Sequence, residues 1–383
     1  MMILLRNVNI YSPAHIGKRD LLIANGVIEK ISEKIFFESD FLDVIECGGA
    51  VAVPGYIDGH VHLTGGGGEN SFRSRVPEIQ FSEFVCSGIT TAVGLLGTDV
   101  LTRDLHGLLA KTRALKEEGL TAFMLTGGYR YPSPTLTDSV DRDIALLPEV
   151  LGVKVAMSDH RASYLDEKDL IRLGSQARVS SMISGKAGVV TIHVGDGKAG
   201  LRPLREAVRL SDVPAKHFIP THINRSEALC EEGLQYLKDG GRIDLTSGMG
   251  IGTDLECWKV LSKAVADGLA TDRITMSSDG NGSWSAYDDC GNITRFGVSS
   301  LATLHDQVRC MVTDGGLSLS QALAFVTANP AEYLGLSSRK GCIQEGADAD
   351  ILLLSDELDI TDVFMGGKQF MKDGQILMKG TFE

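Results

Sequence analysis

The sequence lacks the features that mark membrane-bound, secreted and nucleic-acid-binding proteins. No run approaches the roughly 20 apolar residues that a helix needs to span a bilayer. The first residues do not form a signal peptide, because no basic segment precedes a long apolar one. Basic residues are outnumbered: 37 Lys and Arg stand against 50 Asp and Glu, a formal net charge of −13. Nucleic acids and anionic membranes attract basic surfaces, so neither is an expected partner.

Cysteine is also sparse, with seven widely scattered residues and no Cys-x-x-Cys spacing. An odd number of isolated thiols is typical of a reduced, cytoplasmic protein and makes a structural zinc ribbon unexpected. The remaining composition is ordinary, with 43% hydrophobic residues in 383. That length is sufficient for one large domain and a smaller one.

From about residue 51 to 330, short β-branched runs alternate with longer amphipathic segments, as expected for βα units around a parallel sheet. The eight predicted strands span 52–58, 89–95, 122–126, 152–157, 189–194, 217–222, 242–246 and 273–277. The eight predicted helices span 76–87, 100–118, 140–150, 168–177, 201–210, 226–239, 254–267 and 299–315. This pattern favours an α/β fold of the (β/α)8, or TIM-type, barrel class over an open doubly wound sheet.

The two flanks differ from this middle region. Residues 1–50 and 335–383 read as short strands separated by turn signals such as Asn25-Gly26. Neither flank can build a full core alone. We therefore expect both termini to pair into one small β-sandwich domain beside a barrel that spans residues 51–334.

Six residues of metal-ligand type end apolar runs in the predicted barrel. In an extended strand alternate side chains share a face, so His60 and His62 can point at one metal ion. Alone, such a pair is as often solvated or hydrogen-bonded as it is metal-binding. The other four residues are Lys154, His193, His222 and Asp279. All six fall at the carboxyl ends of predicted strands, where active sites of this fold lie, and imidazole and carboxylate ligands without thiolate suit Zn²⁺.

Each of these residues also has a structural interpretation. Lys154 can be a rim lysine in an ion pair, and Asp279 can cap the turn that follows it. Arg161, Arg225 and Glu69 can likewise form structural salt bridges. The metal-site hypothesis depends on the coincidence of all six ligand-type residues at one rim.

The motifs resemble the amidohydrolase superfamily and, within it, the isoaspartyl (β-aspartyl) dipeptidases. The resemblance covers essentially the whole chain. The motifs that carry it are Pro54–His62 (Pro-Gly-Tyr-Ile-Asp-Gly-His-Val-His), Gly66–Glu69 (Gly-Gly-Gly-Glu), Thr126–Tyr129 (Thr-Gly-Gly-Tyr), Val153-Lys154, Ser158–Arg161 (Ser-Asp-His-Arg), Thr221–Arg225 (Thr-His-Ile-Asn-Arg) and Gly346–Asp350.

The resemblance implies a binuclear metal-dependent hydrolase with two Zn²⁺ ions per subunit. His60, His62 and Asp279 would hold one ion, and His193 and His222 the other. Lys154 would bridge the ions after its amine is carboxylated to N6-carboxylysine. A metal-bound hydroxide would then attack the scissile amide of the substrate. Asp279 would pass the hydroxide proton to the leaving amine, and Tyr129 would donate to the developing oxyanion.

The resemblance also implies a small β-aspartyl dipeptide as substrate and a homo-oligomeric enzyme. Glu69 would bind the α-amino group of the substrate, since an ammonium needs an anion. Guanidinium groups suit its carboxylates, because they form planar bidentate pairs. The remaining substrate-binding residues would be Gly67, Gly68, Thr98, Tyr129, Arg161, Arg225 and Ser283.

Two alternatives remain open. One is another amidohydrolase acting on cyclic amides or N-acyl amino acids, of the dihydroorotase, hydantoinase or deacylase type, which would have no need of Glu69. The other is a catalytically silent scaffold of the same fold, although such proteins typically lose ligands and this chain keeps all six.

Overall fold

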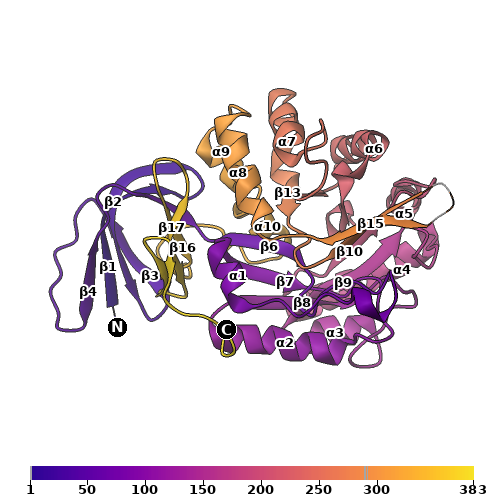
Figure 1. Ribbon diagram of the computed structural model, residues 1–383, viewed down its shortest axis with the longest axis horizontal. Coiled ribbons are helices and arrows are strands. Elements are labelled where there is room, and N and C mark those ends of the chain that lie inside the picture. The colour runs from indigo at the N-terminus through magenta and orange to yellow at the C-terminus, as the bar shows by residue number, and fades with distance from the viewer. Residues whose placement is uncertain (1, 289, 291) are drawn as a thin grey trace.

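A computed structural model describes residues 2–288, 290 and 292–383 of the chain. The molecule consists of two parts that lie side by side (Figure 1). One part is a β-sheet built from the two ends of the chain, and the other is a layer of helices around a curled parallel sheet.

The parallel sheet contains the eight strands between residues 56 and 277. Six of them pair in chain order, and the last two pair with each other. These strands are β6 (Tyr56–Val61), β7 (Ile89–Gly94), β8 (Thr121–Gly127), β9 (Val150–Met157), β10 (Val189–Val194), β11 (Phe218–Thr221), β12 (Ile243–Thr246) and β13 (Ile274–Ser277). Such strands are buried on both faces, and accordingly every residue of β7, β9 and β10 is buried.

Side chains and loop backbone join the remaining neighbours. Between β11 and β12, the Thr221 hydroxyl donates to the Asp244 carboxylate at 2.7 Å. Beside the end of β6, the His62 N–H donates to the Gly280 carbonyl at 2.9 Å, just beyond β13. The first and last strands of the parallel series therefore meet, as a TIM-type barrel requires.

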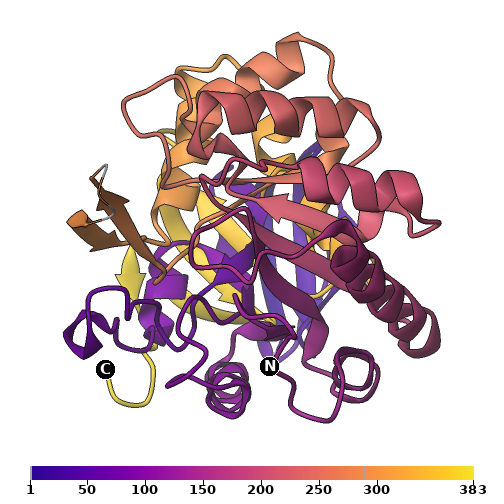
Figure 2. The ribbon, with the colours of Figure 1, turned by 90° about the vertical axis from the view of Figure 1, so that its right-hand side faces the viewer.

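Helices surround these strands (Figure 2). Those that follow the barrel strands are α1 (Phe81–Cys86), α2 (Leu105–Glu118), α3 (Val140–Leu146), α4 (Glu167–Ser184), α5 (Arg202–Leu210), α6 (Glu227–Lys238), α7 (Cys257–Ala266) and α8 (Thr303–Thr313). Two shorter helices, α9 (Leu319–Ala324) and α10 (Ala328–Tyr333), come next. The alternation of strand and helix predicted from the sequence is confirmed. None of the helices in the described part of the chain is both long and apolar enough to cross a membrane.

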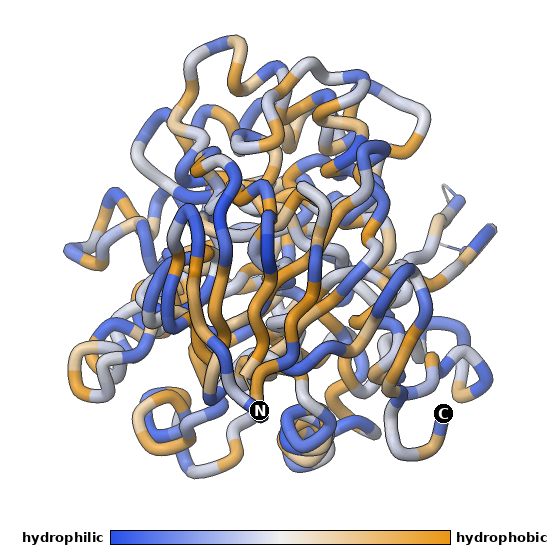
Figure 3. The backbone as a smooth tube through the Cα atoms, turned by 90° about the vertical axis from the view of Figure 1, so that its left-hand side faces the viewer, coloured by the Kyte–Doolittle hydropathy of each residue, from blue (hydrophilic) through white to orange (hydrophobic). Residues whose placement is uncertain are grey.

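The second part is one nine-stranded sheet to which both ends of the chain contribute. Its strands are β1 (Met2–Tyr11), β2 (His15–Ala24), β3 (Val27–Ser32), β4 (Leu42–Glu46), β5 (Val51–Pro54), β16 (Ile351–Leu354), β17 (Ile360–Met365), β18 (Lys368–Lys372) and β19 (Gln375–Ile376). Hydrophobic and hydrophilic stretches follow one another along several of these strands (Figure 3). The description of this part as a β-sandwich stays a prediction, as do the exact domain boundaries.

The predicted strand over residues 52–58 is wrong as a single element. Val51–Pro54 forms β5, which pairs with β1 and β16 of the terminal sheet, whereas the barrel strand β6 begins at Tyr56. Gly55 separates the two strands. A Cβ at Gly55 would lie 2.2 Å from the Thr90 hydroxyl, so only glycine fits where the chain crosses from one sheet to the other.

One antiparallel hairpin follows the last barrel strand. It consists of β14 (Ser283–Tyr287) and β15 (Ile293–Val298), and its first strand begins four residues after Asp279. The sequence pattern predicts no element there. The hairpin extends from the face of the barrel at which the strands end and contributes residues to the pocket described below.

Candidate metal centre and substrate pocket

The six ligand-type residues come from five barrel strands. His60 lies in β6 and His62 directly after it, Lys154 lies inside β9, and His193 lies in β10. His222 directly follows β11, and Asp279 lies two residues after β13. His222 and Asp279 both adopt positive φ angles, of 66° and 53°. Non-glycine residues rarely adopt this conformation, and it is concentrated at functional sites.

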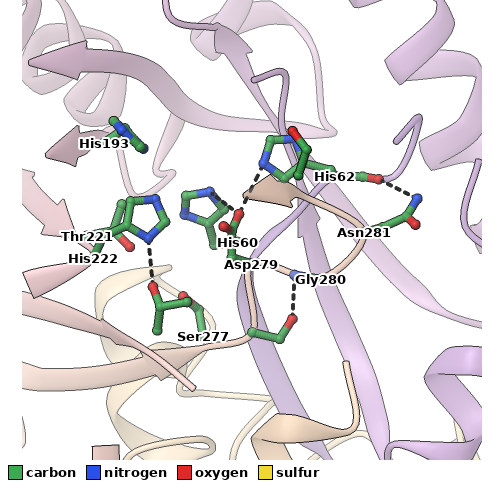
Figure 4. A network of polar contacts seen from close by, with 12 residues as sticks. His60, His62, His193, Thr221, His222, Ser277, Asp279, Gly280 and Asn281 are labelled. Atoms are coloured by element: carbon green, nitrogen blue, oxygen red, sulfur yellow. Dashed lines mark hydrogen bonds and ion pairs between the residues drawn. The ribbon is translucent and has the colours of Figure 1, made fainter. Parts of the chain in front are cut away.

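Donor atoms of His60, His62 and Asp279 converge (Figure 4). One carboxylate oxygen of Asp279 lies 3.3 Å from His60 Nε2 and 3.1 Å from His62 Nε2. Lys154 Nζ lies 3.1 Å from the same nitrogen of His60. The His222 ring lies 5.1 Å from the ring of His60 and 4.6 Å from that of His193, measured between centroids. The sequence therefore identified side chains that the fold brings together.

This geometry fits a divalent cation. Atoms bound to Zn²⁺ at about 2.0 to 2.2 Å lie about 3 to 3.5 Å from one another, which matches the contacts of Asp279. Donor atoms of His60, His222 and Asp279 all lie within 4.8 Å of one another. The Nδ1 atoms of His60 and His62 are buried and have no hydrogen-bond partner among the described residues. The Nε2 atoms of both histidines, in contrast, point toward the Asp279 carboxylate, where a metal ion would lie.

Burial sets the charges in this cluster. It lowers the pKa of His60, His193 and His222 well below the ordinary value, so the three imidazoles are neutral and each has one nitrogen without a proton. Burial also lowers the pKa of Lys154 to about 7, although Asp279 and Asp244 oppose the shift. The Lys154 side chain is completely buried. An ordinary ammonium would repel a metal ion at this position, whereas a neutral amine is a nucleophile.

Outer partners orient two of the histidines. The Thr246 hydroxyl lies 2.7 Å from His222 Nδ1, which leaves Nε2 for the centre. The Asp159 carboxylate accepts from His193 Nε2 at 2.8 Å, and the Tyr129 hydroxyl lies 2.6 Å from His193 Nδ1. Burial would raise the pKa of Asp159, but hydrogen bonds from Arg161 and His193 outweigh it, so the net pKa lies well below the ordinary value.

A pocket opens beside the cluster. It is lined by ten of the residues that the sequence analysis assigned to the site: His62, Gly67, Glu69, Thr98, Tyr129, Arg161, His193, Arg225, Asp279 and Ser283. The Ser283 hydroxyl donates to the Glu69 carboxylate at 2.9 Å, and Arg161 Nη1 lies 3.5 Å from the same group. One acid and two guanidinium groups therefore face the same pocket as Asp279 and His193.

The glycine run forms one wall of the pocket. Gly67 has a φ of 97°, and a Cβ there would lie 2.0 Å from the Ser74 carbonyl oxygen, so only glycine fits. Its N–H donates to the Ser283 hydroxyl at 2.9 Å. Gly68 was assigned to the same wall, but it does not line the pocket, and a Cβ there would point at Asp99. The role of Gly68 in substrate binding stays a prediction.

Several residues of the site are not identified by the sequence patterns. Gly66, Gly97, Met249, Trp284 and Ser285 also line the pocket. Asp159 and Thr246 contact ligand-type histidines from behind. Asp159 stands in the Ser-Asp-His-Arg motif, so a signal was present, but its contact partner His193 lies 34 residues away.

Comparison with known proteins agrees with this geometry. The sequence model of the amidohydrolase family matches residues 190–370. The chain is similar to a β-aspartyl dipeptidase from Fervidobacterium islandicum AW-1, whose crystal structure was determined in complex with a β-Asp-Leu dipeptide. The two sequences are 39% identical. The match covers 100% of both chains with a TM-score of 0.93. The chain belongs to the β-aspartyl dipeptidase family of amidohydrolases.

More distant relatives share the fold of this family. A D-hydantoinase structure superposes on this chain with a TM-score of 0.71, and the two sequences are 21% identical. The match covers 100% of this chain and 98% of the hydantoinase chain. An imidazolonepropionase from Aliivibrio salmonicida is 25% identical over 86% of this chain and 84% of its own length. These relatives carry the names of different activities, so the choice of substrate within the superfamily depends on the pocket.

Proposed function

We propose that the protein is a zinc-dependent isoaspartyl dipeptidase that hydrolyses the β-aspartyl isopeptide bond of dipeptides. One observation carries the proposal. Glu69, Arg161 and Arg225 line the same pocket as Asp279 and His193, two of the six ligand-type residues. A small zwitterionic peptide needs an anion for its ammonium and guanidinium groups for its carboxylates. The relative from Fervidobacterium islandicum AW-1, whose structure contains β-Asp-Leu, supports the same conclusion.

The metal ligands in this proposal are the six residues of the cluster. His60, His62 and Asp279 would hold one Zn²⁺, His193 and His222 would hold the second, and Lys154, carboxylated to N6-carboxylysine, would contribute oxygen ligands to both. The neutral imidazoles and the completely buried Lys154 amine support this assignment. When bound, the two ions supply a water of lowered pKa as nucleophile and polarise the scissile carbonyl.

The side chains of the pocket orient the substrate. Glu69 binds the α-ammonium of the aspartyl residue, and Arg161, Arg225 and Ser283 bind the carboxylates. A site that requires a free ammonium and a free α-carboxylate on one aspartyl residue selects the β-linked peptide bond. In an α-linked peptide that α-carboxylate is consumed in the bond itself.

Two further side chains act on the reacting atoms. Asp279 takes a proton from the attacking water and delivers it to the leaving amine as the carbon–nitrogen bond breaks. Tyr129 donates a hydrogen bond to the carbonyl oxygen as that oxygen gains negative charge. Burial raises the pKa of Tyr129, so its hydroxyl keeps the proton that this role requires.

A cyclic-amide hydrolase of the dihydroorotase or hydantoinase type is the second candidate, and the shared fold supports it. Such a substrate has no ammonium, so the acid at Glu69 would have no function. A cytoplasmic location and a homo-oligomeric state belong to the same proposal. Light scattering after size-exclusion chromatography would test the second of these.

The experiment that tests the function is a steady-state assay of β-Asp-Leu, α-Asp-Leu and dihydroorotate, with metal content measured on the same preparation. We expect about two zinc ions per chain and turnover of β-Asp-Leu far above that of the other two. Preferential turnover of dihydroorotate would select the second candidate. Metal-loaded protein that turns over none of the three would contradict the dipeptidase assignment.

A further inference from the structure

One buried carboxylate behind the metal-ligand cluster has no role in the proposed chemistry. Asp159 lies two residues after β9 and is 4% exposed. Its Oδ2 atom accepts from His193 Nε2 at 2.8 Å and from Arg161 Nη2 at 2.7 Å. Its Oδ1 atom accepts from Arg161 Nε at 2.9 Å and from the Arg161 backbone N–H at 2.8 Å. Both oxygens are therefore engaged, one of them with a ligand-type histidine.

We propose that Asp159 is a positioning residue that holds His193 in the tautomer with its proton on Nε2 and clamps Arg161 in the substrate pocket. The inference rests on the proposed function, because it assigns His193 to a metal ion. A carboxylate can only accept, so the nitrogen that faces it must carry the proton. Nδ1 of His193 then has the lone pair, and this is the nitrogen on the Tyr129 side of the ring.

Backbone packing holds Asp159 in place. A Cβ at Gly195 would lie 2.5 Å from Asp159 Cβ, and one at Gly197 would lie 2.5 Å from the Ser158 carbonyl oxygen. The Gly197 N–H also donates to this carbonyl at 2.6 Å. The loop after β10 therefore packs directly against the segment that carries Asp159. Because His193 lies in β10, histidine and carboxylate are fixed relative to each other.

The same carboxylate connects the two halves of the site. Arg161 Nη1 lies 3.5 Å from Glu69, and Glu69 accepts from Ser283. A continuous series of polar contacts thus runs from His193 through Asp159 and Arg161 to Glu69. Outer carboxylates of this kind orient metal-binding histidines, and their loss typically weakens metal binding about 10- to 100-fold.

The variant Asp159→Asn tests the role. An asparagine has one acceptor oxygen, so it cannot accept all four hydrogen bonds that Asp159 accepts from His193 and Arg161. When its oxygen faces the Arg161 N–H groups, its NH₂ group faces His193, and the ring must move its proton to Nδ1. Zinc affinity is measured by competition with a chelator, and apoprotein stability by thermal unfolding. We expect one of the two zinc ions to bind about 10- to 100-fold more weakly, while the apoprotein unfolds near the wild-type temperature.

Asp20→Asn is the matched control. Asp20 is a buried carboxylate of the terminal sheet that accepts from the backbone N–H groups of Asn7 and Ile35. We expect the opposite pattern from it: lower apoprotein stability with wild-type zinc affinity. If Asp159→Asn instead keeps both zinc affinities within about threefold of wild type, a range well inside the expected loss, Asp159 has no positioning role.

A second measurement does not depend on the folding of any Asp159 variant. Long-range ¹H–¹⁵N spectra of histidine-labelled wild-type apoprotein report which nitrogen of each ring carries the proton, and His193→Gln serves only to assign the signal. A proton on Nε2 of His193 supports the inference, and a proton on Nδ1 overturns it. Neither readout requires peptide hydrolysis. Wild-type protein that fails to cleave β-Asp-Leu would therefore contradict the proposed function and leave this test intact.

Discussion

Replacing Glu69 with glutamine removes the negative charge that the proposed substrate ammonium requires, while the shape of the side chain is kept. The Glu69 side chain is 8% exposed, so its charge lies largely out of water. Its oxygens accept from the Ser283 hydroxyl at 2.9 Å, a bond that the glutamine carbonyl can also accept. The variant therefore isolates the effect of charge from that of packing.

The expected loss follows from the burial of this group. Two unit charges about 4 Å apart attract by about 4 kcal/mol at an effective dielectric constant of about 20. Removing one member of a desolvated, hydrogen-bonded charge pair costs about 2 to 5 kcal/mol. We therefore expect kcat/KM for β-Asp-Leu to fall between about 30-fold and several thousand-fold, since about 1.4 kcal/mol corresponds to a factor of ten.

The assay compares β-Asp-Leu with its N-acetylated analogue, which has no ammonium, in wild type and in Glu69→Gln. We expect the loss to be confined to the free peptide. Glu78→Gln is the control. The Glu78 side chain is 57% exposed, lies outside the substrate pocket, and forms an ion pair with Lys111 over a distance of 3.6 Å. An equal loss for both peptides would refute the reasoning and return the assignment to an amidohydrolase of unknown substrate.

Three further predictions concern the metal centre and the barrel interior. Lys154→Ala should lose zinc and activity together, and a short carboxylic acid should restore part of both by supplying bridging oxygens; metal analysis with and without the acid checks this. Asp279→Asn should lower kcat by about 10²- to 10⁴-fold, since the proton acceptor is removed, and a loss under about tenfold with zinc retained would exclude that role. Burial raises the pKa of Asp244 from 3.8 to about 6. The protonated carboxyl therefore stabilises the folded state at low pH, and this stabilisation is lost as the pH rises through about 6. Urea unfolding of apoprotein measures the free energy of unfolding of Asp244→Asn minus that of wild type. This difference should be about 2 kcal/mol more favourable to the variant at about pH 7.5 than at about pH 4.5.

The sequence was sufficient to predict the barrel strands and the convergence of the ligand-type residues. Barrel strands are apolar runs with fixed spacing, and residues at their carboxyl ends meet at one rim whatever the helices do. His60, Lys154, His193 and Asp279 could therefore be placed together before any distance was known. Glu69 and Arg225 could be placed in the pocket only through the resemblance to the isoaspartyl dipeptidases.

Features that depend on contacts between distant segments could not be predicted. Val51–Pro54 is a strand of the terminal sheet because it pairs with Ile351–Leu354, which lies about 300 residues away. The contact between Asp159 and His193 depends on how two loops pack, and Trp284 enters the pocket from a hairpin that has no strong local signal. Local patterns identify elements, but the pairing of elements decides which polar side chains meet.

The most direct test of the account is a crystal structure of zinc-loaded Asp279→Asn with β-Asp-Leu, with anomalous scattering recorded at the zinc edge. We predict two zinc peaks among His60, His62, His193 and His222, with carboxylated Lys154 between them. The substrate ammonium should lie within hydrogen-bond distance of Glu69. A single metal peak in fully loaded crystals together with an unmodified Lys154 amine, or an ammonium directed away from Glu69, would contradict the account.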